Sequence, residues 1–366
     1  MSTFDIGSID KNLEVAAKVK APDLVLYDVR KPPFQIYGLY EPTTEPCFKR
    51  MPTETAKAVS GGVRSLHVHT AGGRVRFSTN SPYVVIKAVM PSIHPMNHMP
   101  LTGSSGFDLY VDSPDGAQSL FHHCFVPPMG ATDGYESKAD LGEAKWRHFT
   151  INFPLYNPVT ALYVGVAKGS ELGEGAPYRD LPPVVYYGSS ITQGGCASRP
   201  GNAYTAMVGR FLNIDHVNLG FSGNGKAEDS MVEYLCGLKM SAFVSDYDHN
   251  APNPEYLRAT HQKMYDAIRA KYPTVPYIML SRPDYFKNVE DSIARRQVVI
   301  DTFHYAVAKG DKNVYYIDGA SMFRGPFEDC CTVDGVHPND LGFAKMAEAV
   351  YAVLARVLRD DTFLKN

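Results

Sequence analysis

Residues 184–195 read VVYYGSSITQGG and lead from an apolar run directly into a tight turn. Four apolar residues precede Gly188, and two adjacent serines, Ser189 and Ser190, follow it. A short, continuously apolar run that ends in glycine is typical of a strand in a parallel sheet covered on both faces. The end of such a strand lies at the edge where open α/β sheets bind ligands. The stretch therefore predicts an α/β domain with a candidate nucleophile at its edge.

The rest of the second half of the chain alternates in the same way. Short apolar runs predict further strands at 216–221, 242–247, 277–281 and 314–318, and amphipathic stretches predict helices at 254–272, 291–310 and 339–358. This alternation indicates a parallel sheet with helices on both faces, a three-layer α/β/α domain.

The first half reads as a different class of structure. Short runs rich in β-branched and aromatic residues occur at 23–29, 34–40, 63–70, 74–80, 83–90, 106–113, 119–126, 146–153 and 161–167. Many short strands separated by Gly, Pro, Asn and Asp predict an all-β antiparallel sandwich, with a jelly roll as the favoured arrangement. We place the β-sandwich domain at residues 1–175 and the catalytic domain at 176–366, joined by a Gly-, Pro- and charge-rich linker at 168–183.

Polar residues follow the expected strands of the second half and should meet at one edge of the sheet. A serine hydroxyl is a weak nucleophile until a base takes its proton. His337 can be the base for Ser190, and Asp334, three residues earlier, can hold the other imidazole nitrogen. An oxyanion could be stabilised by the backbone N–H groups of Ser190 and Gly223 and by the side-chain amide of Asn250.

Four blocks in this half resemble those of a known family, and the first, second and fourth match it closely. GSSITQG, NLGFSGNG and DGVHPND, in this order between residues 183 and 358, are similar to the motifs of the SGNH hydrolases, also called the GDSL esterase/lipase family. The resemblance implies a flavodoxin-like fold, with Ser190 as nucleophile, Asp334 and His337 as the other triad members, and Gly223 and Asn250 as oxyanion donors. GFDLY at 106–110 resembles the signature of an N-terminal β-domain in one bacterial branch, whose members are esterases or acyltransferases, many associated with sugar-linked acyl groups.

Two positions depart from the family pattern. Ser189 replaces the usual aspartate before the nucleophile, and because that position is outside the triad we expect activity to survive. The third block usually reads G-x-N-D but is DHNA here, so Asn250 has a second interpretation as a helix cap. The elbow G-x-S-x-G of α/β-hydrolases does not occur around Ser190.

Further polar residues follow the third and fourth strands. Asp248 and His249, close to Asp246, are candidates for a substrate pocket. Arg282 could contact a substrate oxygen or this loop, or could form a structural ion pair; both interpretations remain open.

Histidines in the first half do not predict a metal site. His67 and His69 would share one strand face, but nothing nearby completes a ligand set. His94 and His98 are interpreted in the same way.

Composition limits the classes of partner and compartment. A formal net charge of −3 over 366 residues gives no broad basic surface for nucleic acid, and no apolar stretch is long enough to span a membrane. Six cysteines without a C-x-x-C pattern predict free thiols and a cytoplasmic protein, with a removed signal peptide left open.

We therefore expect a serine esterase that hydrolyses short acyl esters, acetyl above all, on a carbohydrate through an acyl-serine intermediate. Its substrate would be a small-molecule or oligosaccharide ester, and we expect no cofactor and no metal. An acyltransferase with the same triad and a catalytically weak carbohydrate-binding protein are the alternatives. The oligomeric state is open.

Overall fold

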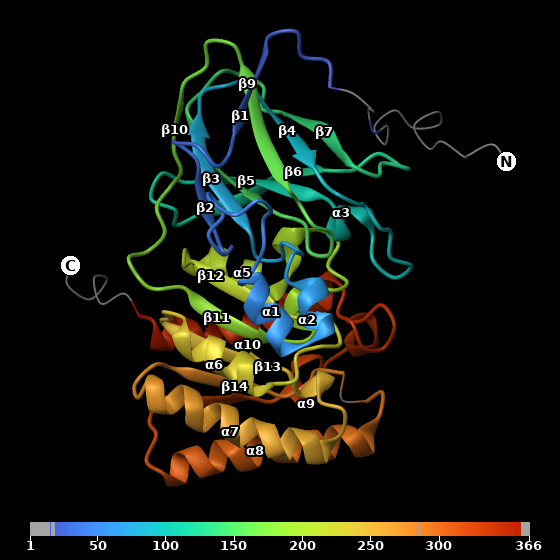
Figure 1. Ribbon diagram of the computed structural model, residues 1–366, viewed down its shortest axis with the longest axis vertical. Helices are drawn as coiled ribbons and strands as arrows, with labels where there is room; N and C mark the ends of the chain where they lie inside the picture. Colours follow the sequence, from blue (N-terminus) through green and yellow to red (C-terminus); the bar gives the residue numbers. More distant parts are fainter. Residues whose placement is uncertain (1–14, 16–18, 285, 360–366) are drawn as a thin grey trace, which may run out of the picture.

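The computed structural model describes residues 15, 19–284 and 286–359, and places a β-sandwich on top of an α/β domain (Figure 1). One sheet of the sandwich has four strands, in the order β1 (Leu24–Asp28), β9 (Ala161–Ala167), β4 (Tyr83–Val89) and β7 (Gly134–Asp140). The other has the order β10 (Leu172–Glu174), β3 (Arg74–Thr79), β8 (Arg147–Asn152), β5 (Phe107–Asp112) and β6 (Ser119–Phe125), with β2 (Gln35–Tyr37) also paired to β3. Every pair within these sheets is antiparallel, so the predicted antiparallel sandwich is confirmed.

The second domain has a five-stranded parallel sheet. Its strands lie in the order β12 (His216–Gly220), β11 (Val184–Gly188), β13 (Ala242–Asp246), β14 (Tyr277–Leu280) and β15 (Val314–Ile317). The longer helices around it are α5 (Tyr204–Leu212), α6 (Asp229–Gly237), α7 (Pro254–Lys271), α8 (Val289–Ala308) and α10 (Asp340–Val357). Its shorter helices are α4 (Ser190–Gln193), α9 (Gly319–Met322) and the 3₁₀ turns η3 (Pro200–Asn202), η4 (Asp248–Asn250) and η5 (Glu328–Cys330). In the sandwich, the short helix α3 (Leu101–Ser104) lies between β4 and β5.

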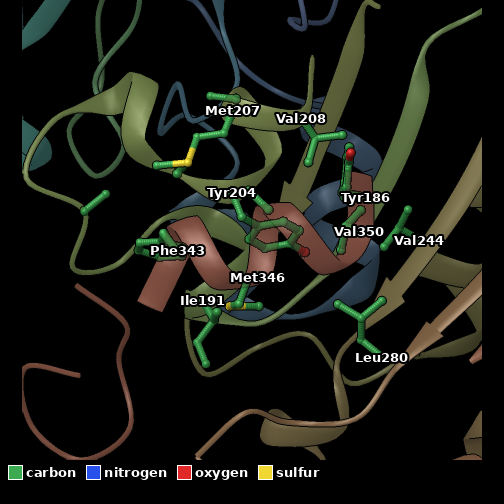
Figure 2. Packing of buried hydrophobic residues seen from close by; sticks show 14 of the residues in the cluster. Tyr186, Ile191, Tyr204, Met207, Val208, Val244, Leu280, Phe343, Met346 and Val350 are labelled. Atoms are coloured by element: carbon green, nitrogen blue, oxygen red, sulfur yellow. The ribbon is translucent and has the colours of Figure 1, made fainter. Parts of the chain in front are cut away.

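Side chains of β11 alternate between two apolar cores, as the period of a strand requires. Val184 and Tyr186 join the core beneath α5 and α10, whereas Val185 and Tyr187 join the core beneath α6, α7 and α8. In the first core, Tyr204 packs between Tyr186 and Phe343, with ring centroids 5.7 and 6.4 Å away (Figure 2). The apolar run therefore forms the middle of three layers, as predicted.

The prediction of a strand at 63–70 is wrong. The first part of this segment belongs to α2 (Gly61–Leu66), which follows α1 (Thr53–Val59). The Ser60 hydroxyl caps α2 by accepting the Val63 N–H at 3.1 Å, and Val63 is buried in the core of the α/β domain. His67 is the C-cap residue of α2, so His67 and His69 do not share a strand face.

Two further differences concern polar strands. β7 was not predicted because its sequence, GYESKAD, has few apolar residues, yet it pairs along its whole length with β4. β10 lies inside the predicted linker and adds to the edge of β3. In both cases pairing with a neighbouring strand decides the structure where apolar alternation is weak.

The segment with α1 and α2 leaves the sandwich and covers the α/β domain. Met51, Ala56 and Val63 are fully buried in the same core as β12 and α6, and both helices lie beside that domain in Figure 1. The two halves of the chain therefore share a core rather than meeting only at a linker.

Arg50 ties this segment to the end of β12. Its guanidinium donates to the backbone oxygens of Asn218, Gly220 and Leu66, and it lies 4.5 Å over the ring of Phe221. Full burial lowers the pKa of Arg50 to about 9. Backbone carbonyls and an aromatic face therefore take the place of water around this buried charge.

The predicted free thiols are confirmed, because all six cysteines are unpaired. None of the described helices combines the length and apolar character that a membrane-spanning helix needs.

We expect Arg50→Met to lower the free energy of unfolding by about 3 kcal/mol, because buried carbonyls lose charged donors. Urea unfolding of the wild type and the variant measures this. Arg64→Met, at an exposed position on α2, is the matched control and should change it by less than about 0.5 kcal/mol. Equal effects of the two variants would contradict the role of Arg50.

Candidate active site

Ser190 is the first residue of α4, directly after β11. The Ser189 hydroxyl accepts the Ile191 N–H at 3.1 Å and so caps α4. Ser189 is fully buried and performs a local structural task, whereas the neighbouring Ser190 is 8% exposed.

A chain of two hydrogen bonds connects Ser190, His337 and Asp334. Ser190 Oγ lies 3.0 Å from His337 Nε2, and His337 Nδ1 lies 2.8 Å from Asp334 Oδ2. These are the distances that a nucleophile, a base and an orienting carboxylate need. The structure therefore brings together the three residues that the sequence analysis selected.

The carboxylate of Asp334 is held ionised. Partial burial opposes its ionisation, but hydrogen bonds from the His337 backbone, the His337 side chain and the Val336 backbone outweigh this and hold the pKa of Asp334 far below its ordinary value. A permanently negative Asp334 favours a positive charge on His337 when that imidazole takes a proton.

The loop that carries the base is fixed at both ends. Asn339 caps α10 by accepting the N–H groups of Leu341 and Gly342, and it donates to the Cys330 carbonyl. On the other side the Lys287 ammonium donates to the Asp334 carbonyl at 2.7 Å. These contacts hold the imidazole next to the serine.

The three predicted oxyanion donors lie at the same sheet edge. Neither the Ser190 N–H nor the Gly223 N–H donates to another described group. Gly223 has φ +68°, a conformation that favours glycine. Asn250 Oδ1 accepts the Gly225 N–H at 3.1 Å, which leaves its NH₂ group without a protein acceptor among the described residues.

The helix-cap interpretation of Asn250 is wrong. The residue that caps α7 is Asn253, whose Oδ1 accepts the Tyr256 N–H at 2.8 Å. Asn250 instead belongs to η4, just after β13.

The predicted pocket residues lie in a buried network. Asp248 Oδ2 accepts the Arg282 backbone N–H at 2.9 Å, and the Arg282 guanidinium pairs with Asp291 at 2.9 Å. His249 Nε2 lies 2.7 Å from Asp284 Oδ1. For Arg282 the structure favours the ion-pair alternative, and Asp248 is too buried to offer a substrate its carboxylate.

Asp246 lies behind the nucleophile. Its Oδ2 accepts hydrogen bonds from Thr192 Oγ1 at 2.9 Å and from the Tyr204 hydroxyl at 3.0 Å, while its Oδ1 is buried without a partner. Burial, together with the nearby charge of Asp248, raises the pKa of Asp246 to about 7.

The β-sandwich contributes residues that the sequence analysis did not assign to the site. His98, in the loop after β4, has its ring centroid 5.4 Å from that of His337. The Tyr156 hydroxyl donates to the Ser190 carbonyl at 3.2 Å. No motif or spacing marks either residue, because their places depend on how the two domains pack.

Comparison with known proteins agrees with this geometry. Residues 182–355 match the GDSL-like lipase/acylhydrolase family, and residues 24–172 match the family described as the N-terminus of Esterase_SGNH_hydro-type. The chain is an SGNH/GDSL-like hydrolase with an N-terminal GxDLY domain. The family resemblance that the sequence motifs indicated is confirmed, and the protein is a GDSL-like esterase or acylhydrolase. No curated protein matches the chain.

Several solved structures share both domains of this hydrolase. A GDSL-like lipase from Bacteroides ovatus is 28% identical, with a TM-score of 0.81 over 92% of this chain and 98% of that one. The salicylyl-acyltransferase SsfX3 of a tetracycline biosynthetic pathway is 19% identical, with a TM-score of 0.73 over 93% and 99%. A family two carbohydrate esterase from Clostridium thermocellum, solved with cellohexaose, is 13% identical, with a TM-score of 0.60 over 89% and 99%. The last two establish a common fold.

We expect Asp246→Asn to change how stability depends on pH. A raised native pKa stabilises the fold below the unfolded pKa of about 4, and this contribution is lost as pH rises through the native value. The unfolding free energy of the wild type relative to Asp246→Asn should therefore fall by on the order of 3 kcal/mol between pH 4 and pH 8. Urea unfolding across this range measures it.

Asp180→Asn, at an exposed linker position, is the control and should show no such trend. A wild type that gains stability over Asp246→Asn as pH rises would contradict the buried, protonated carboxyl.

Proposed function

We propose that this hydrolase is a serine esterase that removes short acyl groups, acetyl above all, from a carbohydrate through an acyl-Ser190 intermediate. The observation that carries the proposal is the line from Ser190 Oγ to His337 Nε2 at 3.0 Å and from His337 Nδ1 to Asp334 at 2.8 Å. A hydroxyl with this partner arrangement can attack an ester carbon as its proton passes to the imidazole.

In the acylation step, Ser190 Oγ bonds to the ester carbon while its proton moves to His337 Nε2. The carbonyl oxygen becomes an oxyanion, and the N–H groups of Ser190 and Gly223 and the NH₂ of Asn250 can donate to it. Asp334 stabilises the imidazolium that forms. Collapse of the intermediate breaks the bond to the alcohol, which leaves with the proton from His337.

Deacylation repeats the sequence with water. His337 takes a proton from a water molecule as its oxygen attacks the acyl carbon, and the bond to Ser190 Oγ breaks. The free acid leaves and Ser190 regains its proton. His337 thus acts as base and then acid in each half of the turnover, and it ends the cycle neutral.

The carbohydrate part of the proposal is supported by the solved structures. The carbohydrate esterase from Clostridium thermocellum shares both domains and is described in complex with cellohexaose. An acetyl xylan esterase from Butyrivibrio proteoclasticus also shares the fold, with a TM-score of 0.56 at 12% identity.

The second candidate is an acyltransferase with the same triad. The observation that favours it is the TM-score of 0.73 with a salicylyl-acyltransferase, higher than the 0.60 found with the carbohydrate esterase. In a transferase the acyl-serine is intercepted by a second alcohol in place of water. We further propose a reducing compartment, such as the cytoplasm, for which the six free thiols are the support.

We expect Ser190→Ala to reduce kcat/KM for p-nitrophenyl acetate by more than about 10⁴-fold, because the covalent step is lost. Ser189→Ala is the matched control: it should keep activity within about tenfold and lower stability by about 1 kcal/mol through the lost cap. Steady-state hydrolysis and urea unfolding measure both. Undiminished turnover in Ser190→Ala would reject the nucleophile.

We expect acetate to be the best substrate in a p-nitrophenyl series from acetate to decanoate, and acetylated xylo- or cello-oligosaccharides to release acetate. Repeating the assay with unacetylated sugars or polyols as acceptors distinguishes the two candidates. Free acetate as the main product supports the esterase, whereas an acetylated acceptor formed in preference to acetate replaces it with the transferase.

A further inference from the structure

Three ligand-type side chains from distant parts of the chain meet at the catalytic base. One ligand atom each of His98, Cys196 and His337 lies within 4.8 Å of the other two. His98 comes from the sandwich, Cys196 from the loop after α4, and His337 from the loop before α10. No spacing in the sequence groups them, because 98 positions separate His98 from Cys196 and 141 separate Cys196 from His337.

Packing holds the three segments in place. Met99 is buried in the same core cluster as Cys196, which fixes the backbone next to His98. The Thr102 hydroxyl donates to the Ser198 carbonyl, so the sandwich loop is bonded to the loop of Cys196. The Cys196 N–H in turn donates to the Pro338 carbonyl at 3.3 Å, next to His337.

The cluster is open to solvent on one side. The His98 side chain is exposed, whereas Cys196 is almost fully buried beneath it. The exposed His98 imidazole is therefore the ligand of the three that an ion in solvent can contact most readily. The Asp334 carboxylate interacts electrostatically with Cys196 and adds a negative charge that favours a cation.

A thiolate and two imidazoles are the ligands that Zn²⁺ prefers, and three protein ligands with one open position are common in zinc sites. Tetrahedral Zn²⁺ with bonds of about 2.0–2.3 Å sets its ligand atoms about 3.5 Å apart. Rotation of the exposed His98 ring can close the remaining gap of about 1 Å. A hard cation such as Mg²⁺ prefers oxygen ligands and does not suit this set.

We propose that His98, Cys196 and His337 form a reversible Zn²⁺ site that switches the catalytic relay off. Both nitrogens of His337 belong to the relay, Nε2 toward Ser190 and Nδ1 toward Asp334. Zinc on either nitrogen therefore removes His337 from proton transfer. The Cys196 thiol loses its proton to solvent as the Zn–S bond forms, and no electron transfer takes place.

Zinc binding itself does not depend on the proposed function, but its effect on turnover does. The first experiment is therefore a direct titration with ZnCl₂ by calorimetry, on the full chain freed of metal by EDTA. We expect one site in the wild type and an affinity at least about 100-fold weaker in His98→Ala and in Cys196→Ser. His94→Ala, an exposed histidine on the same loop, is the matched control and should bind like the wild type.

The two variants protect the test against a folding defect. Cys196→Ser changes a buried position, so its thermal unfolding is compared with that of the wild type; His98→Ala changes an exposed side chain and should fold normally. Wild-type affinity in a folded His98→Ala would overturn the proposal, as would an equal loss in His94→Ala.

The second readout is p-nitrophenyl acetate hydrolysis over the same zinc range. We expect half-inhibition of the wild type at the Kd from calorimetry, with activity restored by EDTA and with MgCl₂ without effect. His98→Ala should need about 100-fold more zinc for the same fractional inhibition. An enzyme that binds zinc at this site and retains full turnover would overturn the switch, whereas a protein without esterase activity that still binds zinc would reject only the proposed function.

Discussion

The position of β11 between β12 and β13 is the constraint on which the site depends. Gly188, the last residue of β11, pairs with Gly220 on one side and with Asp246 on the other, so three strands end at one level. A Cβ on Gly188 would lie 2.3 Å from the Asp246 carbonyl, closer than real atoms come. The absence of a side chain lets the strand ends meet, and the loops that carry Ser190, Gly223 and Asn250 leave the sheet together.

The β-sandwich supports this edge from above. Arg50 holds the carbonyls at the end of β12, and Tyr156 holds the Ser190 carbonyl. His98 lies beside the catalytic imidazole. The first half of the chain thus contributes both supporting hydrogen bonds and a side chain to the site. The packing of the two domains also places His98 and Cys196 where a metal ion could compete for His337.

The protein keeps unfavourable groups behind the site. One carboxylate oxygen each of Asp246 and Asp248 is buried without a partner, and such groups normally destabilise a fold. Both lie where β13 leads into η4, next to Asn250. A buried polar group without a partner is retained where the arrangement of side chains serves function rather than stability.

Local sequence was sufficient wherever a local pattern carries the physics. The apolar run before Gly188 and the helical periodicity of residues 254–272 predicted the α/β domain, and the D-x-x-H spacing predicted the Asp334–His337 pair, because a three-residue turn brings those side chains together whatever surrounds them. Only the tertiary structure decided that residues 61–66 are a helix and that His98 lies at His337. Those outcomes depend on burial against segments distant in the chain, and contacts of that range leave no periodicity or spacing in the sequence.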